Sequence, residues 1–341
     1  MRGLYLSHPS SHAHETGPHP ESARRLRAVE SALAAQDWLG LERIEGPTAS
    51  RESLTAVHEE TMLGEIEALA QSGGGAIDSD TIVSPASWEA ALHAAGSACQ
   101  AVDLLSEAGG GAPGHAFCGV RPPGHHAEGS RPMGFCLVNN VAIAARHAQA
   151  EHGASRVAVV DFDVHHGNGT QEIFYDDEGV LFVSIHQSPL WPGSGSTEEV
   201  GAAAGLGATV NLPVPPGSGG PTYAALFSLL VLPILSQWAP DLLLVSAGFD
   251  AHRSDPLAEC LLDTEDFALI GAELRRASLE LGAPLISCLE GGYSVDALSE
   301  SVVAYLGAVI EPGSFVAPAP DPDLVARQIQ AHGGRWSGLG G

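Results

Sequence analysis

The stretch Val157–Gln171, V-A-V-V-D-F-D-V-H-H-G-N-G-T-Q, constrains the fold of this chain more than any other. A short apolar run that ends in a Gly-rich turn is typical of a buried parallel strand leaving a sheet. Asp163, His165 and His166 follow this run, at the edge where ligands gather in open α/β sheets. If the strand continued, Asp161, Asp163 and His165 would share one face, because successive side chains of a strand alternate. Two carboxylates and an imidazole at such a place are costly unless a cation compensates them, so the stretch predicts a divalent metal site.

Three further predicted strands end in polar side chains that catalysis commonly uses. One strand runs into a rigid Pro-Pro-Gly turn, which presents His125 and His126 in fixed directions. Two later apolar strands run into Asp250 and Tyr293. Because the carboxyl ends of parallel strands meet at one edge of a sheet, we expect these residues to gather near Asp163.

The rest of the chain alternates apolar runs with amphipathic stretches, which predicts an α/β fold. We expect one domain with a mostly parallel central sheet of about eight strands and helices on both faces. The domain would cover residues 1–312, and a loosely packed tail rich in Pro and Gly would follow over 313–341. The long loop Trp191–Gly220 would form a rim around a site. The other predicted strands are Gly3–Ser7, His115–Val120, Gly179–His186, Thr209–Pro213, Asp241–Ser246 and Pro284–Leu289. The predicted helices are Ser22–Ala35, Ser53–Gln71, Ser87–Ser106, Asn139–Glu151, Tyr223–Gln237, Thr264–Leu281 and Val295–Val309.

Asp163, His165 and Asp250 would form a ligand set that leaves one metal position open for water. Catalytic zinc sites are built in this way, and the metal lowers the pKa of its water to about 7. A nearby imidazole can act as general base and then protonate a leaving amine, and the hydroxyl of Tyr293 could stabilise the oxyanion. The set predicts metal-assisted hydrolysis of an amide.

Each of these residues alone has a simpler explanation. A lone Asp or His at a strand end is more often a cap or a turn former, and the G-F-D segment at Asp250 could simply begin a turn. Tyr293 after two glycines would more often be a packed aromatic. Four strand ends that each supply a suitable residue are hard to attribute to chance.

Composition narrows the class of partner. The formal net charge is −26, and the 15 basic residues are all arginine. Such a chain is a poor candidate for nucleic acid, whose binding depends on Lys and Arg aimed at phosphates. An acidic surface could favour a cationic substrate, although salt screens such steering. Five cysteines without a C-x-x-C spacing predict reduced, buried thiols.

The N-terminal residues lack the long apolar stretch of a signal peptide. The most apolar segment, Leu226–Leu235, contains Pro233 and is too short to span a bilayer. We therefore expect a cytoplasmic protein that has no membrane partner.

Five motifs together resemble one known family. They are R-P-P-G-H-H-A, G-F-C-L-V-N-N, D-F-D-V-H-H-G-N-G-T-Q, S-A-G-F-D-A-H and E-G-G-Y, in that order along the chain. In these motifs the chain resembles the histone deacetylases and acetylpolyamine amidohydrolases, which share the arginase/deacetylase fold. The resemblance covers about Gly3 to Val309, and the form of the motifs is most similar to the class II and bacterial deacetylase-like amidohydrolases.

The resemblance implies two kinds of bound metal. Asp163, His165 and Asp250 would bind one Zn²⁺ per chain, although Fe²⁺ could occupy the same ligands. A structural K⁺ is also implied. Its ligand groups would come from Asp161, Asp163, His165, Ser184 and Ile185.

The resemblance also assigns catalytic roles. His126 would be the general base and acid, and His125 beside it an electrostatic partner oriented by Asp161. Tyr293 would polarise the acyl carbonyl. Asn168 would orient His126, and it stands where class I members have aspartate, so this partner would be uncharged.

The remaining implied residues concern the substrate. Gly134 and Phe135 would line an acyl-lysine channel, and Arg25 would line an internal exit channel. Leu257 occupies a gatekeeper position where a polyamine-selective branch carries glutamate, which favours an acylated lysine peptide over a small acylated amine. The acidic loop Gly73–Asp80 keeps the polyamine alternative open.

Two alternatives from other classes remain at the level of sequence. The first is an arginase-like dinuclear manganese hydrolase, which would need further Asp and His ligands. The second is a silent acyl-lysine binding module, which the presence of every catalytic position disfavours. The loop Trp191–Gly220 is also a plausible contact surface for a homo-oligomer.

Overall fold

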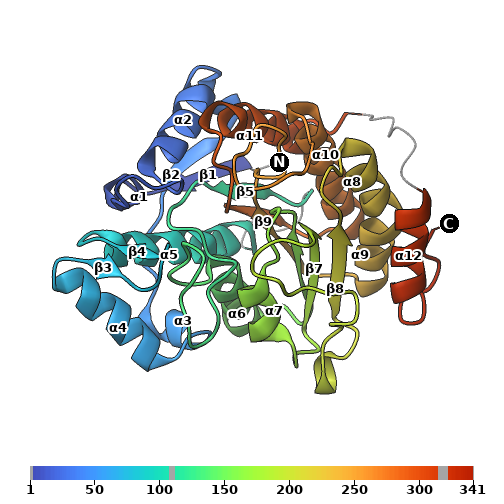
Figure 1. Cartoon of the computed structure of the whole chain (residues 1–341), viewed down its shortest axis with the longest axis horizontal. Helices are drawn as coiled ribbons and strands as arrows, with labels where there is room; N and C mark the ends of the chain where they lie inside the picture. The colour runs from blue at the N-terminus through green and yellow to red at the C-terminus, as the bar shows by residue number, and fades with distance from the viewer. Residues whose placement is uncertain (1–2, 107–111, 314–321, 341) are drawn as a thin grey trace.

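Eight parallel strands form the central sheet of the described part of the chain, in the order β2-β1-β5-β10-β9-β6-β7-β8 (Figure 1). The computed structural model describes residues 3–106, 112–313 and 322–340. The strands are β1 Gly3–Ser7, β2 Glu42–Glu45, β5 His115–Cys118, β6 Val157–Asp161, β7 Val180–Gln187, β8 Thr209–Val214, β9 Leu242–Ala247 and β10 Leu285–Leu289. A small antiparallel pair, β3 Gly75–Ala76 and β4 Ile82–Val83, lies apart from this sheet. The predicted α/β class with a parallel sheet is therefore confirmed.

The sheet separates two apolar cores because successive side chains of each strand point to opposite faces. In β6, Ala158 and Val160 belong to the larger core, whereas Val157 and Val159 belong to the second core. Every residue of β6 is buried, as expected for a strand covered on both sides. This double burial explains why the apolar runs of the sequence located the strands so well.

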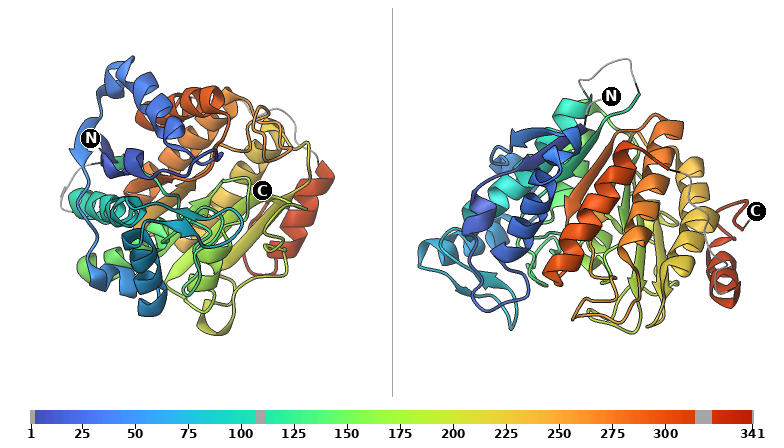
Figure 2. Two further views of the ribbon diagram at one scale, coloured as in Figure 1. Left: turned by 60° about the vertical axis from the view of Figure 1, so that its left-hand side comes forward. Right: turned by 90° about the horizontal axis from the view of Figure 1, so that it is seen from above.

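Helices cover both faces of the sheet (Figure 2). On one side α2, α8, α9, α10 and α11 contribute to the larger core, and on the other side α5 and α6 pack against each other. The helices are α1 Ser10–Ala13, α2 Ala23–Ala34, α3 Arg51–Thr55, α4 Glu60–Gln71, α5 Ser87–Ser106, α6 Asn140–His152, α7 Asn168–Phe174, α8 Gly220–Leu226, α9 Leu232–Trp238, α10 Thr264–Leu281, α11 Val295–Ile310 and α12 Pro322–His332. The five cysteines are buried and free, as predicted.

The helix predicted over Ser53–Gln71 is two helices, α3 and α4. Between them, His58 turns inward and is only 2 % exposed. Its ring lies 2.9 Å from the carbonyl of Glu128 and accepts a 2.8 Å hydrogen bond from the amide of Asn139. These contacts tie the break to the loop that carries His125 and His126, which the local periodicity does not reveal.

Several elements were absent from the prediction, among them β2, α12, α1, α7 and the pair β3 and β4. The edge strand β2 has the polar sequence E-R-I-E, and α12 lies where we expected a loosely packed tail. Leu324 and Val325 of α12 are buried in the larger core, and the ring of His332 lies 3.0 Å from the carbonyl of Asn211 in β8. The expectation of loose packing is therefore wrong for α12, because two apolar side chains and one imidazole anchor this helix. Residues 314–321 of the predicted tail lie outside the described part.

By length and composition, one helix of the described chain, Gly220–Trp238, could cross a membrane. It comprises α8, a π-helical segment over Phe227–Val231, and α9. Within the fold, 61 % of its most apolar window is buried. Its side chains pack in the larger core beside α10.

Candidate active site

Four adjacent strands bring the predicted site residues together. β5, β10, β9 and β6 are neighbours in the sheet and run in the same direction, so the loops after them open on one edge. These loops carry His125 and His126, Tyr293, Asp250, and Asp163 with His165. Side chains separated by up to 168 residues in the chain therefore share one site.

Asp163, His165 and Asp250 form a buried cluster whose ligand atoms all lie within 4.8 Å of one another. Nδ1 of His165 is 3.2 Å from Oδ1 of Asp163 and 3.2 Å from Oδ2 of Asp250. β6 ends at Asp161, so Asp163 and His165 lie in the following loop, and strand alternation alone does not align them. Backbone hydrogen bonds fix them there.

The remaining oxygens of both carboxylates accept hydrogen bonds from backbone amides. The amide of Gly291 donates to Oδ2 of Asp163 over 2.7 Å, and that of Val164 donates to Oδ1 of Asp250 over 2.8 Å. A Cβ at Gly291 would stand 2.0 Å from Oδ2 of Asp250, and one at Gly248 would stand 2.1 Å from Oδ2 of Asp163. Only glycine at these two places lets the carboxylates approach, so the loops are shaped to hold both anions side by side.

The charges around His165 are consistent with a cation site. Burial alone would lower the pKa of His165, but its contacts with Asp163 and Asp250 outweigh this and raise the pKa to about 10. Two buried carboxylates and one imidazole, with one side open to a cavity, match the donor set that divalent transition metals prefer. The three residues predicted as zinc ligands thus fit such an ion.

His125 and His126 lie side by side but differ in their partners. Nδ1 of His125 is 3.0 Å from Oδ2 of Asp161, and Nδ1 of His126 is 2.9 Å from Oδ1 of Asn168. Burial would lower the pKa of His125, but the negative charges of the nearby aspartates raise it to about 10. Burial and the neighbouring imidazoles hold the pKa of His126 well below its usual value. The pKa values of the two neighbouring rings are therefore shifted in opposite directions.

Tyr293 lines the same cavity as His126 and His165. Its backbone amide donates a 2.7 Å hydrogen bond to Oδ2 of Asp255, and the guanidinium of Arg25 lies 4.9 Å from the centre of its ring. Arg25 is itself fully buried and donates to the carbonyls of Gly292 and Glu290 over 2.6 and 2.5 Å. Burial raises the pKa of Tyr293 well above 10, so its hydroxyl keeps its proton and can donate it.

A cavity of about 200 Å³ leads to these groups. The predicted channel residues Gly134, Phe135 and Leu257 line it, and a Cβ at Gly134 would stand 2.5 Å from the ring of His126. The sequence prediction missed Trp191 as a wall: its indole lies 4.7 Å from the ring of His126, centre to centre. An aromatic residue at the start of a Gly/Pro-rich rim loop was the available signal. The lining is Asp80, His126, Gly134, Phe135, His165, Leu190, Trp191, Leu257 and Tyr293.

The residues predicted for a potassium site also lie together. Asp161 pairs with Ser184 across β6 and β7, and Ile185 follows in β7. All three are fully buried, and the hydroxyl of Ser184 lies 2.9 Å from Nδ1 of His186.

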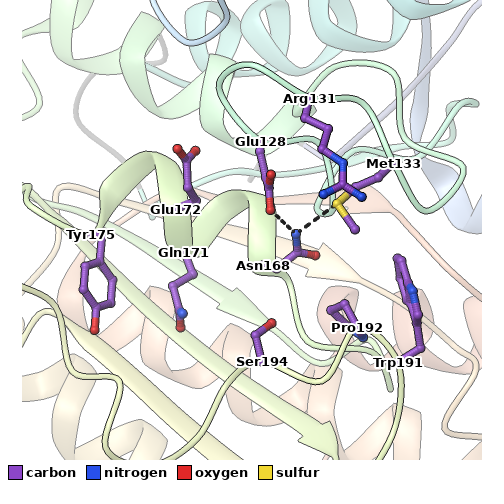
Figure 3. A pocket seen from close by; sticks show the side chains of 10 residues that line it. All are labelled: Glu128, Arg131, Met133, Asn168, Gln171, Glu172, Tyr175, Trp191, Pro192 and Ser194. Carbon is purple, nitrogen blue, oxygen red and sulfur yellow. Dashed lines mark hydrogen bonds between the residues drawn. The ribbon is translucent and has the colours of Figure 1, made fainter. Parts of the chain in front are cut away.

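A second cavity, of about 540 Å³, shares Trp191 with the first cavity. Figure 3 shows the side chains that line this second cavity. Asn168 stands between this cavity and the site. Its Nδ2 donates to Oε1 of Glu128 over 2.9 Å and to the sulfur of Met133 over 3.4 Å.

Comparisons with known proteins agree with this geometry. Residues 19–309 match the model of the histone deacetylase domain. The chain is 41 % identical over 306 residues to a probable deacetylase of Methanothermobacter thermautotrophicus, covering 89 % of both chains. It is 38 % identical over 322 residues to a histone deacetylase-like amidohydrolase of Pseudomonas aeruginosa, covering 93 % of this chain and 81 % of that one. The crystal structure of the HDA15 HD domain superposes with a TM-score of 0.91 at 32 % identity, covering 98 % of this chain and 97 % of that one. The chain belongs to the histone deacetylase family and is a deacetylase of the amidohydrolase type.

Proposed function

We propose that the protein is a zinc-dependent amidohydrolase that removes acetyl groups from lysine side chains or similar amines. The observation that carries this proposal is the convergence of Asp163, His165 and Asp250 beneath a cavity of about 200 Å³ that His126 and Tyr293 also line. A ligand set, a neutral base and a hydroxyl donor at the end of one narrow channel are the parts that amide hydrolysis needs.

Asp163, His165 and Asp250 would hold the ion, Zn²⁺ or alternatively Fe²⁺. When bound there, such an ion supplies Lewis acidity, which makes water a better nucleophile and the acyl carbonyl a better electrophile. The backbone amides of Gly291 and Val164 hold the two carboxylates in place for it.

His126 would move the proton. Its Nδ1 faces Asn168, so its Nε2 is the atom available to take a proton from the attacking water and pass it to the leaving amine. His125, held by Asp161, would keep a positive charge beside the reacting centre and so stabilise the developing negative charge.

Tyr293 would donate a hydrogen bond to the acyl oxygen as it gains charge. Phe135 packs edge-on against its ring, with 5.7 Å between ring centres, and Trp191 makes an edge contact with His126. These aromatic walls would exclude bulk water, which strengthens every electrostatic contact within the channel.

A structural K⁺ between the carboxyl ends of β6 and β7 is part of the same proposal. Its ligand groups would come from Asp161, Asp163, His165, Ser184 and Ile185. Backbone carbonyls and the Ser184 hydroxyl are oxygen donors, which this cation prefers.

The substrate is the finer question. Leu257 presents an apolar side chain to the channel, which supports an acylated lysine peptide. Asp80 lines the same channel and the chain is strongly acidic, which supports an acetylated polyamine as the second candidate. Measurement of kcat/KM for an acetyl-lysine peptide and for acetylspermidine separates the two. The proposal expects the peptide to be preferred, and a preference for acetylspermidine would assign the protein to the second candidate.

The dinuclear manganese alternative has less support. Among the described residues, one group of three ligands gathers at this site, which suits a single ion. A silent binding module would hold acylated peptide without releasing acetate, so the same assay also tests that alternative.

A further inference from the structure

A second cluster of metal-ligating side chains lies on two helices and shares no residue with the active site. Asp103 belongs to α5, and His147 and His152 belong to α6. One ligand atom from each lies within 4.8 Å of the other two. In the described part of the chain, this is the one such group besides Asp163, His165 and Asp250.

Both imidazoles of this cluster point at the same carboxylate oxygen. Nε2 of His147 is 2.6 Å from Oδ1 of Asp103, and Nε2 of His152 is 2.7 Å from it. Ligands of one tetrahedral zinc ion stand about 3.4 Å apart, because each bond is about 2.0–2.2 Å long. A small outward rotation of these surface side chains would therefore place an ion between them.

The surroundings allow an ion to enter and favour positive charge. The side chains of Asp103, His147 and His152 are 41 %, 15 % and 23 % exposed, so water can complete the coordination. Asp103 and His147 also line a cavity of about 450 Å³ between the two helices and the loop before α3. His152 is the last residue of α6, where the helix dipole is negative, and the whole chain carries −26.

We infer that Asp103, His147 and His152 form a second site for a divalent transition-metal ion, which links α5 to α6. Two imidazoles and one carboxylate form a borderline donor set, which selects Zn²⁺ and its first-row neighbours over Mg²⁺ or Ca²⁺. The ion would stabilise the packing of the two helices without touching the reacting groups.

Metal counting on the whole protein tests this site. The protein is stripped with chelator, incubated with Zn²⁺ alone, passed through a desalting column and analysed for bound zinc. We expect two ions per chain in the wild type, one in Asp103→Asn, one in Asp250→Ala and none in the double variant. His12→Gln is the matched control, because His12 contacts a single carboxylate, Glu30, over 2.8 Å.

The two sites are distinguishable by their consequences. Asp103→Asn should release acetate at the wild-type rate. In the wild type, Zn²⁺ added beyond one equivalent should raise the melting temperature, and Asp103→Asn should show no such rise. A second equivalent that persists in Asp103→Asn would overturn the inference, as would a wild type that retains one ion only. Simultaneous loss of both ions in Asp250→Ala would indicate a dinuclear active site instead.

A different observation concerns Glu128 and rests on the proposed function. An Asn side chain can present either its oxygen or its nitrogen to a neighbour, and its hydrogen bonds decide which. An ionised carboxylate only accepts, so Glu128 requires the Nδ2 group of Asn168 to face it (Figure 3). Oδ1 of Asn168 then faces Nδ1 of His126, which must carry a proton. The lone pair of His126 is thereby kept on Nε2.

Backbone hydrogen bonds on both sides of Glu128 fix its position. Its amide donates to the carbonyl of Arg131 over 2.9 Å, and its carbonyl lies 2.9 Å from the ring of the buried His58. The geometry assigns to Glu128 the role of a positioning residue that selects the tautomer of His126 through Asn168. Without it, the amide could turn over and place the imidazole proton on the wrong nitrogen.

Glu128→Gln is the test, because glutamine has the same shape but can accept or donate. We expect kcat on an acetyl-lysine peptide to fall by about tenfold, while KM and metal content stay unchanged. This loss is smaller than the rate enhancement of about 10²–10⁴ that a general base contributes, because the base itself remains. In the Asn168→Asp background no amide needs orienting, so the same change should cost less than twofold. Glu172→Gln is the matched control. Glu172 lines the same cavity, but its carboxylate accepts a hydrogen bond from the amide of Gly129 and not from Asn168.

Equal losses in both backgrounds, or a Glu128→Gln enzyme within twofold of the wild type, would overturn this role. Histidine-selective ¹⁵N NMR provides a readout that needs no turnover. The wild type should show His126 protonated on Nδ1, and Glu128→Gln should show a mixture of tautomers. If the tautomer of His126 is the same in Glu128→Gln as in the wild type, the role of Glu128 is refuted, whether or not the wild type releases acetate. A wild type that releases no acetate would count against the proposed function and not against the role of Glu128.

Discussion

Nδ1 of His126 lies 2.9 Å from Oδ1 of Asn168, so this buried imidazole is held by an uncharged partner. The adjacent His125 is held instead by the carboxylate of Asp161, over 3.0 Å. The pKa values of the two neighbouring rings are therefore shifted in opposite directions, because their partners and surroundings differ. Two titratable groups whose environments separate their pKa values are commonly assigned different catalytic roles.

His126→Gln should lower kcat on an acetyl-lysine peptide by about 10²–10⁴, because it removes the base but leaves the ligand cluster untouched. Steady-state kinetics with metal analysis of the same sample measures this. A variant that keeps its metal and more than a tenth of the wild-type kcat would exclude His126 as the general base.

Tyr293→Phe should lower kcat by about 10²–10³, because one hydrogen bond to the developing oxyanion is lost. Metal content should not change, since the hydroxyl is not part of the ligand cluster. Tyr175→Phe is the control, because Tyr175 lines only the neighbouring cavity. Near-normal turnover by Tyr293→Phe would refute the role of its hydroxyl.

Trp191→Ala should widen the channel and relax the choice of acyl group. A difference of one methylene in a hydrophobic pocket is worth about 10–200-fold in kcat/KM, so the butyryl-to-acetyl ratio should rise at least tenfold. The ratio is measured with matched peptides, and Leu206→Ala, a change at a 62 % exposed residue, serves as control. An unchanged ratio in Trp191→Ala would show that the indole does not limit the channel.

His58 should make stability depend on pH. Burial lowers its pKa to about 4, whereas an unfolded histidine titrates near 6.5. The unfolded chain therefore binds a proton that the folded chain resists, so stability is full above pH 6.5 and falls as the pH drops towards 4. Within that window His58 contributes a slope of up to about 1.4 kcal/mol per pH unit.

Urea unfolding at several pH values between 4.5 and 8 measures this slope. His58→Ala should be less stable than the wild type at pH 8, because Asn139 loses the acceptor for its amide. Its stability should also fall less steeply towards pH 4.5. An identical slope in both proteins would contradict the assignment.

The sequence predicted most where burial leaves a simple pattern. The fully buried strands β6, β9 and β10 appeared as apolar runs, and the residues that follow them pointed to one edge of the sheet. The approach of Asp163 to Asp250 followed from that shared edge. The geometry of the two carboxylates depends on hydrogen bonds from backbone amides and on the absence of a Cβ at Gly248 and Gly291. The pattern of apolar and polar side chains does not predict these contacts.

The elements that escaped prediction lack such a pattern. β2 is an exposed, charged edge strand, and the break before α4 depends on long-range bonds of His58. α12 is held by few apolar side chains. Trp191 belongs to a loop whose path is set by tertiary contacts, so its position over His126 could not be derived from local sequence.

Acetate release that depends on the metal ligands tests the central claim most directly. Three zinc-reconstituted proteins are incubated with an acetyl-lysine peptide: the wild type, Asp250→Asn and the surface control Asp37→Asn. The amount of acetate released is compared with the amount of deacetylated peptide formed. We expect equimolar release by the wild type and by Asp37→Asn, which is lost on chelation and returns with zinc. Asp250→Asn should release no acetate. Release by Asp250→Asn at the wild-type rate would contradict the central claim, as would a zinc-loaded wild type inactive on the peptide, on acetylspermidine and on longer acyl groups.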